Sequence, residues 1–235
     1  MSSGLADRNG DCDWVRPGDR LHRDHLALLR RAFRNADLGD RRVLEIGSGR
    51  GGNCYYLSSY AGVRRLVGVD SSVASTRAAG RVCGDGVRFV GGDIAALPFR
   101  DRAFDVVLNV EGSPFYPDRR TLLAEVARVL TPGGVFVYMD IFPRDEEALA
   151  AASRDASLDI ESDEDVTEEA FQALRRPDGL EALLREIVTE ANRDLVRDIL
   201  QQRRSIAISL ALGRTRARIV RLVRRAPGTP RPRPG

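Results

Sequence analysis

The sequence predicts an α/β domain in which a doubly wound, seven-stranded, mostly parallel sheet carries helices on both faces and helical lid segments. Two patterns predict this class. Short apolar runs alternate with stretches of helical periodicity, and polar or Gly-rich residues follow several apolar runs where each run ends. The chain has 235 residues, which is enough for one such domain with a lid.

Seven apolar runs are predicted as strands. The first five lie in the N-terminal 140 residues, and the last two flank a long helical stretch. The predicted strands are 42–46, 66–69, 87–90, 104–109, 135–140, 158–162 and 217–223. Residues Thr131 to Gly134 (Thr-Pro-Gly-Gly) are interpreted as a turn that leads into the fifth strand.

Helical periodicity fills the intervals between these runs. A first helix is predicted to begin after Asp19, as its N-cap, and to end at Gly39. Further helices are predicted over 121–130, 146–156, 168–175 and 180–200. The N-terminal helix and the segment 166–212 are expected to act as covers. The domain is expected to span 19–225, between a flexible segment 1–18 and a disordered tail 226–235 that is rich in Pro and Arg.

Composition narrows the classes of function. The net charge is only +3, and all 37 basic residues are arginines spread among 34 acidic residues, so no nucleic-acid partner is expected. Apolar runs stay shorter than the roughly 20 residues of a membrane span, and the N-terminus lacks a signal-peptide pattern. We therefore expect a cytoplasmic protein. The 3 cysteines form no CxxC pair, and His22 and His25 lack further ligands at metal-site spacing, so no metal is predicted.

The strongest local signal is the segment 43–53, where an apolar strand enters a Gly-rich turn that opens a helix. Glycines allow positive φ and a close approach of backbone amides to a ligand. The spacing of Gly47, Gly49 and Gly52 also fits a dinucleotide site, so the glycines alone do not discriminate. Glu45 does, because a carboxylate before the turn would repel a pyrophosphate and suits a cationic ligand.

Three further polar positions follow predicted strands. Asp70 ends the second strand, 21 residues after Gly49, where a carboxylate can accept bonds from two ribose hydroxyls. Asp93 and Ile94 follow the third strand and pair an acceptor with an apolar contact, as an adenine base requires. Asn109 ends the fourth strand, where the reacting end of the ligand would lie.

Each of these residues also has an ordinary structural interpretation. Glu45 could be a surface residue, Asp70 a helix cap, Asp93 a turn former and Asn109 another cap. All four, however, are predicted at the carboxyl ends of successive parallel strands, which is where open α/β sheets bind ligands. We therefore interpret them as one binding site.

The chain resembles the class I S-adenosylmethionine-dependent methyltransferases in several segments. The resemblance is closest to the small-molecule branch that includes phthiotriolone ketone methyltransferases and sugar O-methyltransferases of antibiotic pathways. The matching segments are 44–52, 92–108, 109–111 and 130–134, with a looser match over 165–174. The resemblance implies a Rossmann-like fold, S-adenosylmethionine as cofactor and S-adenosylhomocysteine as product.

The resemblance also implies roles by position. The residues implied to line the methionine part are Glu45, Gly47, Ser48, Gly49 and Gly51. Asp70 would hold the ribose with Ser71 beside it, and Asp93 and Ile94 would hold adenine. Asn109 and Glu111 would lie near the sulfonium and the acceptor.

One departure from the family pattern affects the chemistry. After Asn-Val-Glu, members of this branch usually continue with a small residue, a Ser and then a His that is the candidate general base. Here Pro114 occupies the place of that His, and general-base catalysis is typically worth ~100- to 10,000-fold. Three alternatives remain open: another base, an acceptor acidic enough to need none, or a different reaction. The replacement bases considered are Glu111, Asp140, Tyr116 and His25.

The predicted function is methyl transfer from S-adenosylmethionine to oxygen or carbon of a small natural product such as a polyketide, lipid or sugar. One alternative is a cyclase or rearrangement enzyme of the same fold that binds the cofactor without transferring methyl. Others are a non-catalytic cofactor-binding protein and a nicotinamide enzyme, and Glu45 disfavours the last. The protein is expected to be a monomer or homodimer, since helix 180–200 can pack on its own domain or on a second subunit.

Overall fold

The computed structural model describes residues 14–18, 23–34, 36, 38–110, 118–143, 146–175, 193–226 and 228. The chain forms two compact units. The first comprises Met1–Arg34, Phe142–Arg144 and Asp165–Ala217, and the second comprises Asn35–Ile141, Asp145–Glu164 and Arg218–Gly235.

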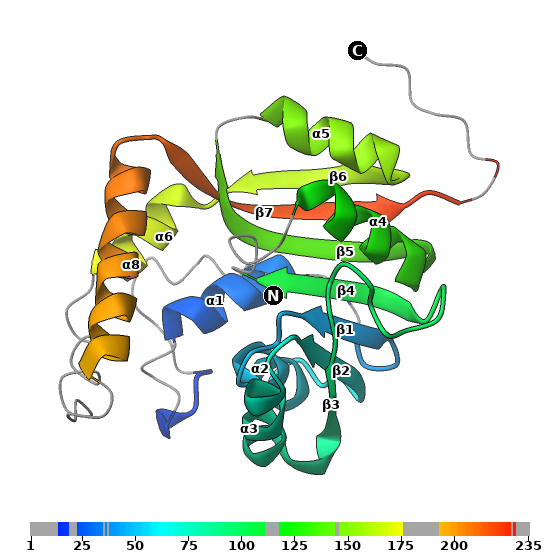
Figure 1. The fold of residues 1–235 in the computed structure, drawn as a ribbon, viewed down its shortest axis with the longest axis horizontal. Helices are drawn as coiled ribbons and strands as arrows, with labels where there is room; N and C mark the ends of the chain where they lie inside the picture. Colours follow the sequence, from blue (N-terminus) through cyan, green and yellow to red (C-terminus); the bar gives the residue numbers. More distant parts are fainter. Residues whose placement is uncertain are drawn as a thin grey trace. The chain divides into compact units, whose positions relative to one another are not determined.

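The second unit is built on a seven-stranded sheet with the order β3-β2-β1-β4-β5-β7-β6. Its strands are β1 (Arg42–Ile46), β2 (Arg65–Asp70), β3 (Val87–Gly91), β4 (Phe104–Val110), β5 (Leu130–Pro143), β6 (Leu158–Asp165) and β7 (Thr215–Arg224). The first five strands pair in parallel. Strand β7 lies between β5 and β6 and is antiparallel to both (Figure 1). The predicted seven-stranded, mostly parallel sheet is confirmed.

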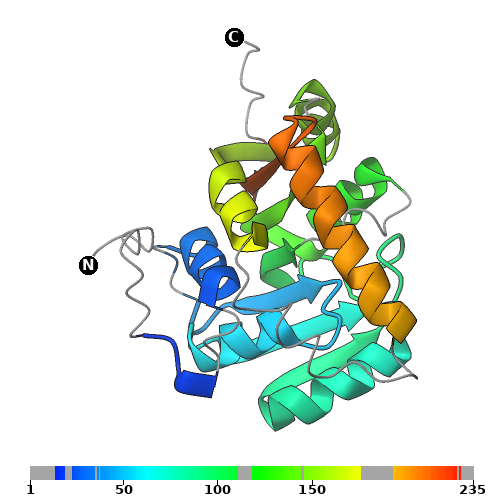
Figure 2. The ribbon, with the colours of Figure 1, turned by 90° about the vertical axis from the view of Figure 1, so that its left-hand side faces the viewer.

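The order of the strands also explains the double winding. From β1 the chain moves outward through β2 and β3, whereas β5 lies beyond β4 on the other side. Right-handed crossovers therefore put α2 (Gly52–Ser59) and α3 (Val73–Cys83) on one face and α4 (Arg119–Val129) on the other. Helices α2 and α3 pack against β2 and β3 (Figure 2), and α4 packs against α5 (Glu146–Asp155).

The core of this unit lies where the predicted apolar runs meet. Four of the five residues of β1 are buried, as expected for a central parallel strand that is covered on both faces. Helix α4 buries Leu122, Leu123, Val126 and Val129, whose spacing places them on one face of the helix.

Strand β5 is longer than predicted and begins inside the expected turn. Leu130 pairs with Phe104, and the register then shifts so that Val135 pairs with Val106. The intervening residues form a bulge in which Gly133 has φ 75°. The prediction of a turn that precedes the strand was therefore wrong, because a bulge accommodates Pro and Gly without ending the pairing.

The last two strands are joined by charged pairs. Arg218 pairs with Asp163, Arg221 with Glu161 at 3.1 Å, and Arg225 with Asp159. Strand β6 extends beyond its predicted C-terminal end, and β7 extends beyond its predicted bounds at both ends. Charged side chains on an edge strand such as β6 discourage pairing with another chain.

The first unit contains α1 (Arg23–Ala32), α6 (Thr167–Arg175) and α8 (Arg193–Ala211). Arg31 joins α1 to α6 through an ion pair with Glu169 at 2.9 Å, and α6 packs against α8. Helix α1 ends at Ala32, so the predicted end at Gly39 was wrong; the apolar periodicity stops at Phe33. Asp19 and the part of the predicted helix 180–200 before Arg193 lie outside the described residues.

A helix that crosses a membrane must be both long and apolar. Among the residues that the structure describes, every helix is too short or too polar to cross a bilayer.

Candidate functional site

The Gly-rich turn of the second unit connects β1 to α2. Gly47, Gly49 and Gly51 all have positive φ, of 68°, 51° and 86°. At Gly51 an added Cβ would lie 3.0 Å from Ala79 Cβ and 3.1 Å from Cys83 Sγ. The turn therefore needs glycine at Gly51 both for its backbone conformation and for its close packing against α3.

Glu45 lies in β1 directly before this turn and is buried, with 1% of its surface exposed. One carboxylate oxygen accepts a hydrogen bond from Asn53 Nδ2 at 2.7 Å, and the other accepts one from Cys54 Sγ at 2.8 Å. Burial raises the pKa of Glu45 to about 7, although the two hydrogen bonds oppose that shift. The interpretation of Glu45 as a surface residue was wrong.

Asp70 ends β2 and is tied to the turn. Its carboxylate accepts hydrogen bonds from the backbone N–H of Gly49 at 2.9 Å and of Ser72 at 2.8 Å. Ser72, not Asp70, is the N-cap of α3. Each carboxylate oxygen of Asp70 retains a further lone pair, so it can still accept bonds from a diol. The neighbouring Ser71 is exposed.

Ser48 contributes an unusual polar atom to the turn. Ser48 is 4% exposed, and its Oγ is buried without a hydrogen-bond partner among the described residues. Its backbone N–H donates to the carbonyl of Val69 at 3.0 Å, which holds the turn against β2. A buried hydroxyl without a partner costs stability, and such a cost is commonly found where a ligand binds.

The remaining predicted binding residues follow β3 and β4. Asn109 is buried in β4 and donates from Nδ2 to the carbonyl of Ile46 at 3.1 Å, so it is not a helix cap. Asp93 is exposed and accepts a bond from the N–H of Ala95 at 2.9 Å. Ile94 beside it is half-buried.

Parallel register brings these positions together. Ile46 lies opposite Val69 on one side and Asn109 on the other, and Asp70 lies opposite Gly91. The carboxyl ends of four adjacent strands therefore meet at one edge of the sheet. The predicted cofactor residues share this edge, as the sequence indicated.

The structure places the four candidate bases differently. Glu111, Tyr116 and the departure at Pro114 lie outside the described residues. Asp140 is buried in β5, with one carboxylate oxygen accepting the N–H of Ile141 at 2.7 Å. His25 is half-buried in α1 of the first unit.

Asn53 and Cys54 are site residues that sequence reasoning missed. Both come from the first turn of α2 and hold the two oxygens of Glu45. Burial and the adjacent carboxylate raise the pKa of Cys54, so it stays a neutral thiol. The signal that could have found them was their spacing, 8 and 9 residues after Glu45 across a turn that folds back on the strand.

A metal site at this edge would need several His, Cys, Asp or Glu side chains close together. Within the described parts of the chain, no three His, Cys, Asp or Glu side chains gather into a group that could hold a metal ion. The donor set consists instead of backbone amides, a buried carboxylate and a second carboxylate beside the turn, which fits an organic cation with a diol.

Known sequences match the region that carries this site. Residues 44–138 match the family model described as a methyltransferase domain. A phthiotriol/phenolphthiotriol dimycocerosates methyltransferase of Mycobacterium tuberculosis is 44% identical over 135 residues, which cover 55% of this chain and 48% of the relative. A fatty-acid O-methyltransferase of Mycolicibacterium smegmatis is 36% identical over 183 residues, which cover 76% of this chain and 66% of the relative. The chain thus spans about half the length of the first of these relatives.

Solved structures share the fold at low identity. A geranyl diphosphate C-methyltransferase from Streptomyces coelicolor A3(2), crystallised with Mg²⁺, geranyl diphosphate and S-adenosyl-L-homocysteine, is 20% identical with a TM-score of 0.67, covering 87% of this chain and 81% of that one. The cyclase SpnF is 19% identical with a TM-score of 0.67 and the same coverage of 87% and 81%. These structures show the shared fold, and the domain match with the curated relatives identifies the chain as a member of the class I S-adenosylmethionine-dependent methyltransferase family.

Proposed function

We propose that this chain transfers a methyl group from S-adenosylmethionine to a small lipid or natural-product acceptor. The observation that carries the proposal is Glu45, a carboxylate buried at the carboxyl end of the central strand beside an amide-lined turn. A buried carboxylate whose pKa is raised to about 7 is an unfavourable element of a folded protein unless a cation compensates it. S-adenosylmethionine carries both an ammonium and a sulfonium group.

Different residues of the chain would bind different parts of the cofactor. Glu45 lies beside the turn that would hold the methionine part, and a cation there would favour its ionised form. Ser48 Oγ, buried without a partner among the described residues, can donate to a carboxylate or accept from an amine. Asp70 would accept from the ribose hydroxyls while its bonds to Gly49 and Ser72 keep it in place.

Methyl transfer is an in-line displacement in which the cofactor, when bound, supplies the methyl group and the leaving sulfide. The chain contributes mainly position and exclusion of water. Asn109, buried opposite Ile46 and bonded to its carbonyl, would fix the floor of the site near the reacting end.

We further propose a fatty-acid carboxylate as the acceptor. The departure at Pro114 removes the usual candidate base, and a carboxylate needs none, because it is already ionised at neutral pH. The relative that matches the greatest share of this chain among those reported above is named a fatty-acid O-methyltransferase, which supports this acceptor class.

The cofactor part is tested by calorimetric titration with S-adenosylmethionine, S-adenosylhomocysteine and NADH. We expect binding of both adenosyl compounds and none of NADH. Asp70→Ala should weaken adenosyl binding ~100-fold, because the ribose hydroxyls would lose their two hydrogen bonds to the charged carboxylate. Failure of the wild-type protein to bind either adenosyl compound would contradict the proposal.

The acceptor part is tested with S-adenosylmethionine carrying a labelled methyl group. A free fatty acid should be methylated, whereas the fatty alcohol of the same chain length should not, because only the alcohol needs a base. Methylation of the alcohol alone would contradict the carboxylate acceptor while leaving methyl transfer intact.

A cyclase is the second candidate function, favoured by Pro114 and by the fold shared with SpnF. It predicts conversion of an acceptor without formation of S-adenosylhomocysteine. Formation of S-adenosylhomocysteine in equal amount to a product heavier by one methyl group would exclude it.

A further inference from the structure

The loop 92–102 of the second unit, which carries Asp93 and Ile94, is held by side chains that the proposed site does not include. Its start is tied to β2, since the N–H of Gly92 donates to the carbonyl of Asp70 at 3.1 Å. An added Cβ at Gly92 would lie 2.7 Å from Pro98 and 3.0 Å from Val69. The loop therefore folds back on itself immediately around Asp93.

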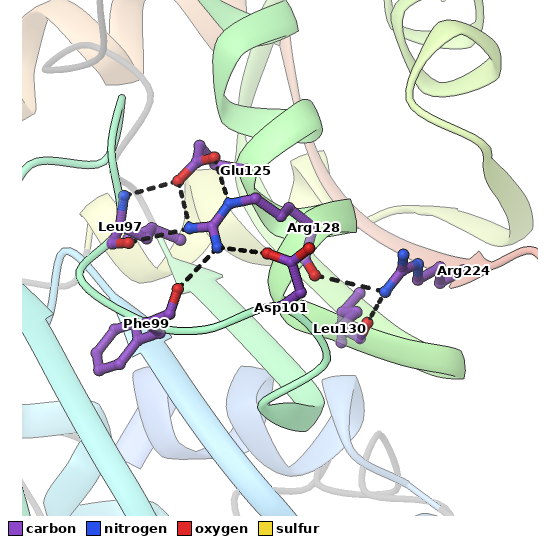
Figure 3. Close-up of polar contacts among 7 residues, drawn as sticks. All are labelled: Leu97, Phe99, Asp101, Glu125, Arg128, Leu130 and Arg224. Carbon is purple, nitrogen blue, oxygen red and sulfur yellow. Dashed lines mark hydrogen bonds and ion pairs between the residues drawn. The ribbon is translucent and has the colours of Figure 1, made fainter.

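The far part of the loop is held by Arg128 of α4 (Figure 3). The guanidinium donates to the carbonyls of Leu97 at 3.0 Å and Phe99 at 2.7 Å, and to Asp101 at 2.9 Å. Its other two donors bond the two oxygens of Glu125 at 2.7 and 2.8 Å. All five N–H donors of the guanidinium are thus used.

Glu125 completes this arrangement from one helical turn away. Besides pairing with Arg128, it accepts a bond from the N–H of Leu97 at 2.7 Å. Its side chain is 16% exposed and that of Arg128 is 31% exposed. The pair lowers the pKa of Glu125, chiefly through the bond from Arg128, so the ionised pair persists at neutral pH. The backbone carbonyl of Arg128 also accepts from the N–H of Arg102 at 3.0 Å.

The loop is also held by packing, through the edge-to-face contact of Phe99 and Phe104 at 5.0 Å and the buried Leu97. The bonds from Arg128 add to this packing and act directly on the backbone. Here a planar fork with five donors sets the path of the backbone on both sides of Pro98, 4 to 6 residues after Asp93. Lysine could supply the charge but not the fork.

We propose that Glu125 and Arg128 are positioning residues that hold the loop 92–102 in the shape that recognises the adenine base, and so set the selectivity for adenine. This inference rests on the proposed function, because it assumes an adenosyl ligand at Asp93. Neither residue touches the ligand; they act through the backbone that carries Asp93.

The test compares two ligands that differ at the base, S-adenosylhomocysteine and S-inosylhomocysteine, by calorimetry on Arg128→Lys and Glu125→Gln. The wild-type protein should prefer the adenosyl compound, because Asp93 accepts from an amine and repels a carbonyl. Arg128→Lys should reduce this preference ~10-fold, the order expected for one misplaced hydrogen bond to a charged group. Glu125→Gln, which keeps one acceptor for Leu97, should reduce it less.

Two controls separate positioning from general stability. Arg42→Lys weakens another arginine fork, the one with Asp105, and should leave the base preference unchanged. Amide hydrogen exchange without ligand should accelerate in peptides from 94–102 in Arg128→Lys and stay constant in peptides from β1.

The outcomes that overturn the inference are distinct from those that overturn the proposed function. An unchanged base preference in Arg128→Lys, or an equal fall in Arg42→Lys, contradicts the inference while adenosyl binding stands. If the wild-type protein binds neither nucleoside, the proposed function fails and the inference fails with it.

Discussion

The two ends of strands β1 and β4 hold buried or half-buried carboxylates in opposite electrostatic states. At the amino end, Asp105 accepts from the backbone N–H of Arg42 at 3.0 Å and from its guanidinium at 3.0 and 2.7 Å. These bonds lower the pKa of Asp105 to about 2. At the carboxyl end, the described donors to Glu45 are neutral, namely the Asn53 amide with the thiol and backbone N–H of Cys54, and burial raises its pKa to about 7.

The difference distinguishes a structural carboxylate from one that is suited to a ligand. Asp105 has a cationic partner within the fold, so its charge already stabilises the folded state. Among the described residues, the groups that hold the oxygens of Glu45 are neutral, so a bound cation would stabilise its ionised form. The prediction with the largest expected effect concerns the turn beside Glu45, and three further predictions test the comparison of the carboxylates.

Gly51→Ala should cause the largest loss of stability. Alanine at φ 86° costs about 1–2 kcal/mol, and the contacts of its Cβ with Ala79 and Cys83 add about 1–3 kcal/mol. Urea denaturation should show a loss of ~3 kcal/mol. The matched control is Gly62→Ala, with φ 68° and open space around the Cβ, which should lose only ~1 kcal/mol. Equal losses would mean that the turn does not pack as tightly as described.

Glu45→Gln should stabilise the free protein at high pH and weaken cofactor binding. The folded-state pKa of about 7 lies above the ordinary 4.5, so the contribution of Glu45 is fully present below pH 4.5 and is lost as the pH rises through 7. The gap between the folded and the ordinary pKa corresponds to about 3 kcal/mol. Urea denaturation from pH 4.5 to 8 should show this decline in the wild type and not in the variant. A parallel decline in both would contradict the assignment.

Asp105→Asn should have the opposite pH dependence. The folded-state pKa of about 2 lies below the ordinary 3.8, so the stabilisation is present above pH 3.8 and is lost as the pH falls through 2. The gap between the folded and the ordinary pKa corresponds to about 2 kcal/mol. The variant should be less stable by that amount at pH 7, with unchanged affinity for S-adenosylhomocysteine. Weaker ligand binding would show that the two ends of the strands are coupled.

Asp40→Asn provides the baseline for an ion pair without burial. Arg64 and Asp40 lie 3.9 Å apart with 80% and 93% of their side chains exposed. The variant should lose no more than about 0.5 kcal/mol in urea denaturation, and 1 M salt should remove the difference. A loss as large as that of Asp105→Asn would mean that pairing alone, without burial, explains the amino-end effect.

The central strands and the binding edge could be predicted because local chemistry determines them. Strand β1 matches its predicted bounds, and β2, β3 and β4 differ by one or two residues, since continuous apolar runs between turn residues have few other solutions. Glu45 and Asp70 were assigned to strand ends from their position after such runs. The Gly-rich turn followed from residues that tolerate positive φ.

Contacts between distant segments were not predictable in the same way. The bulge in β5 depends on the register with β4, which no pattern in 130–135 encodes. Arg128 looked like any exposed charge on a helix, because its partners lie 27 to 31 residues earlier in the chain.

The sequence by itself therefore determined the fold class, the strands and the identity of the groups at the carboxyl edge, because hydrophobic periodicity and glycine conformations act over a few residues. Only the tertiary structure decided the states of those groups. Burial raised the pKa of Glu45, pairing with Arg42 lowered that of Asp105, and the fork of Arg128 set the path of the loop after Asp93. Each of these depends on desolvation or on partners that only folding brings together.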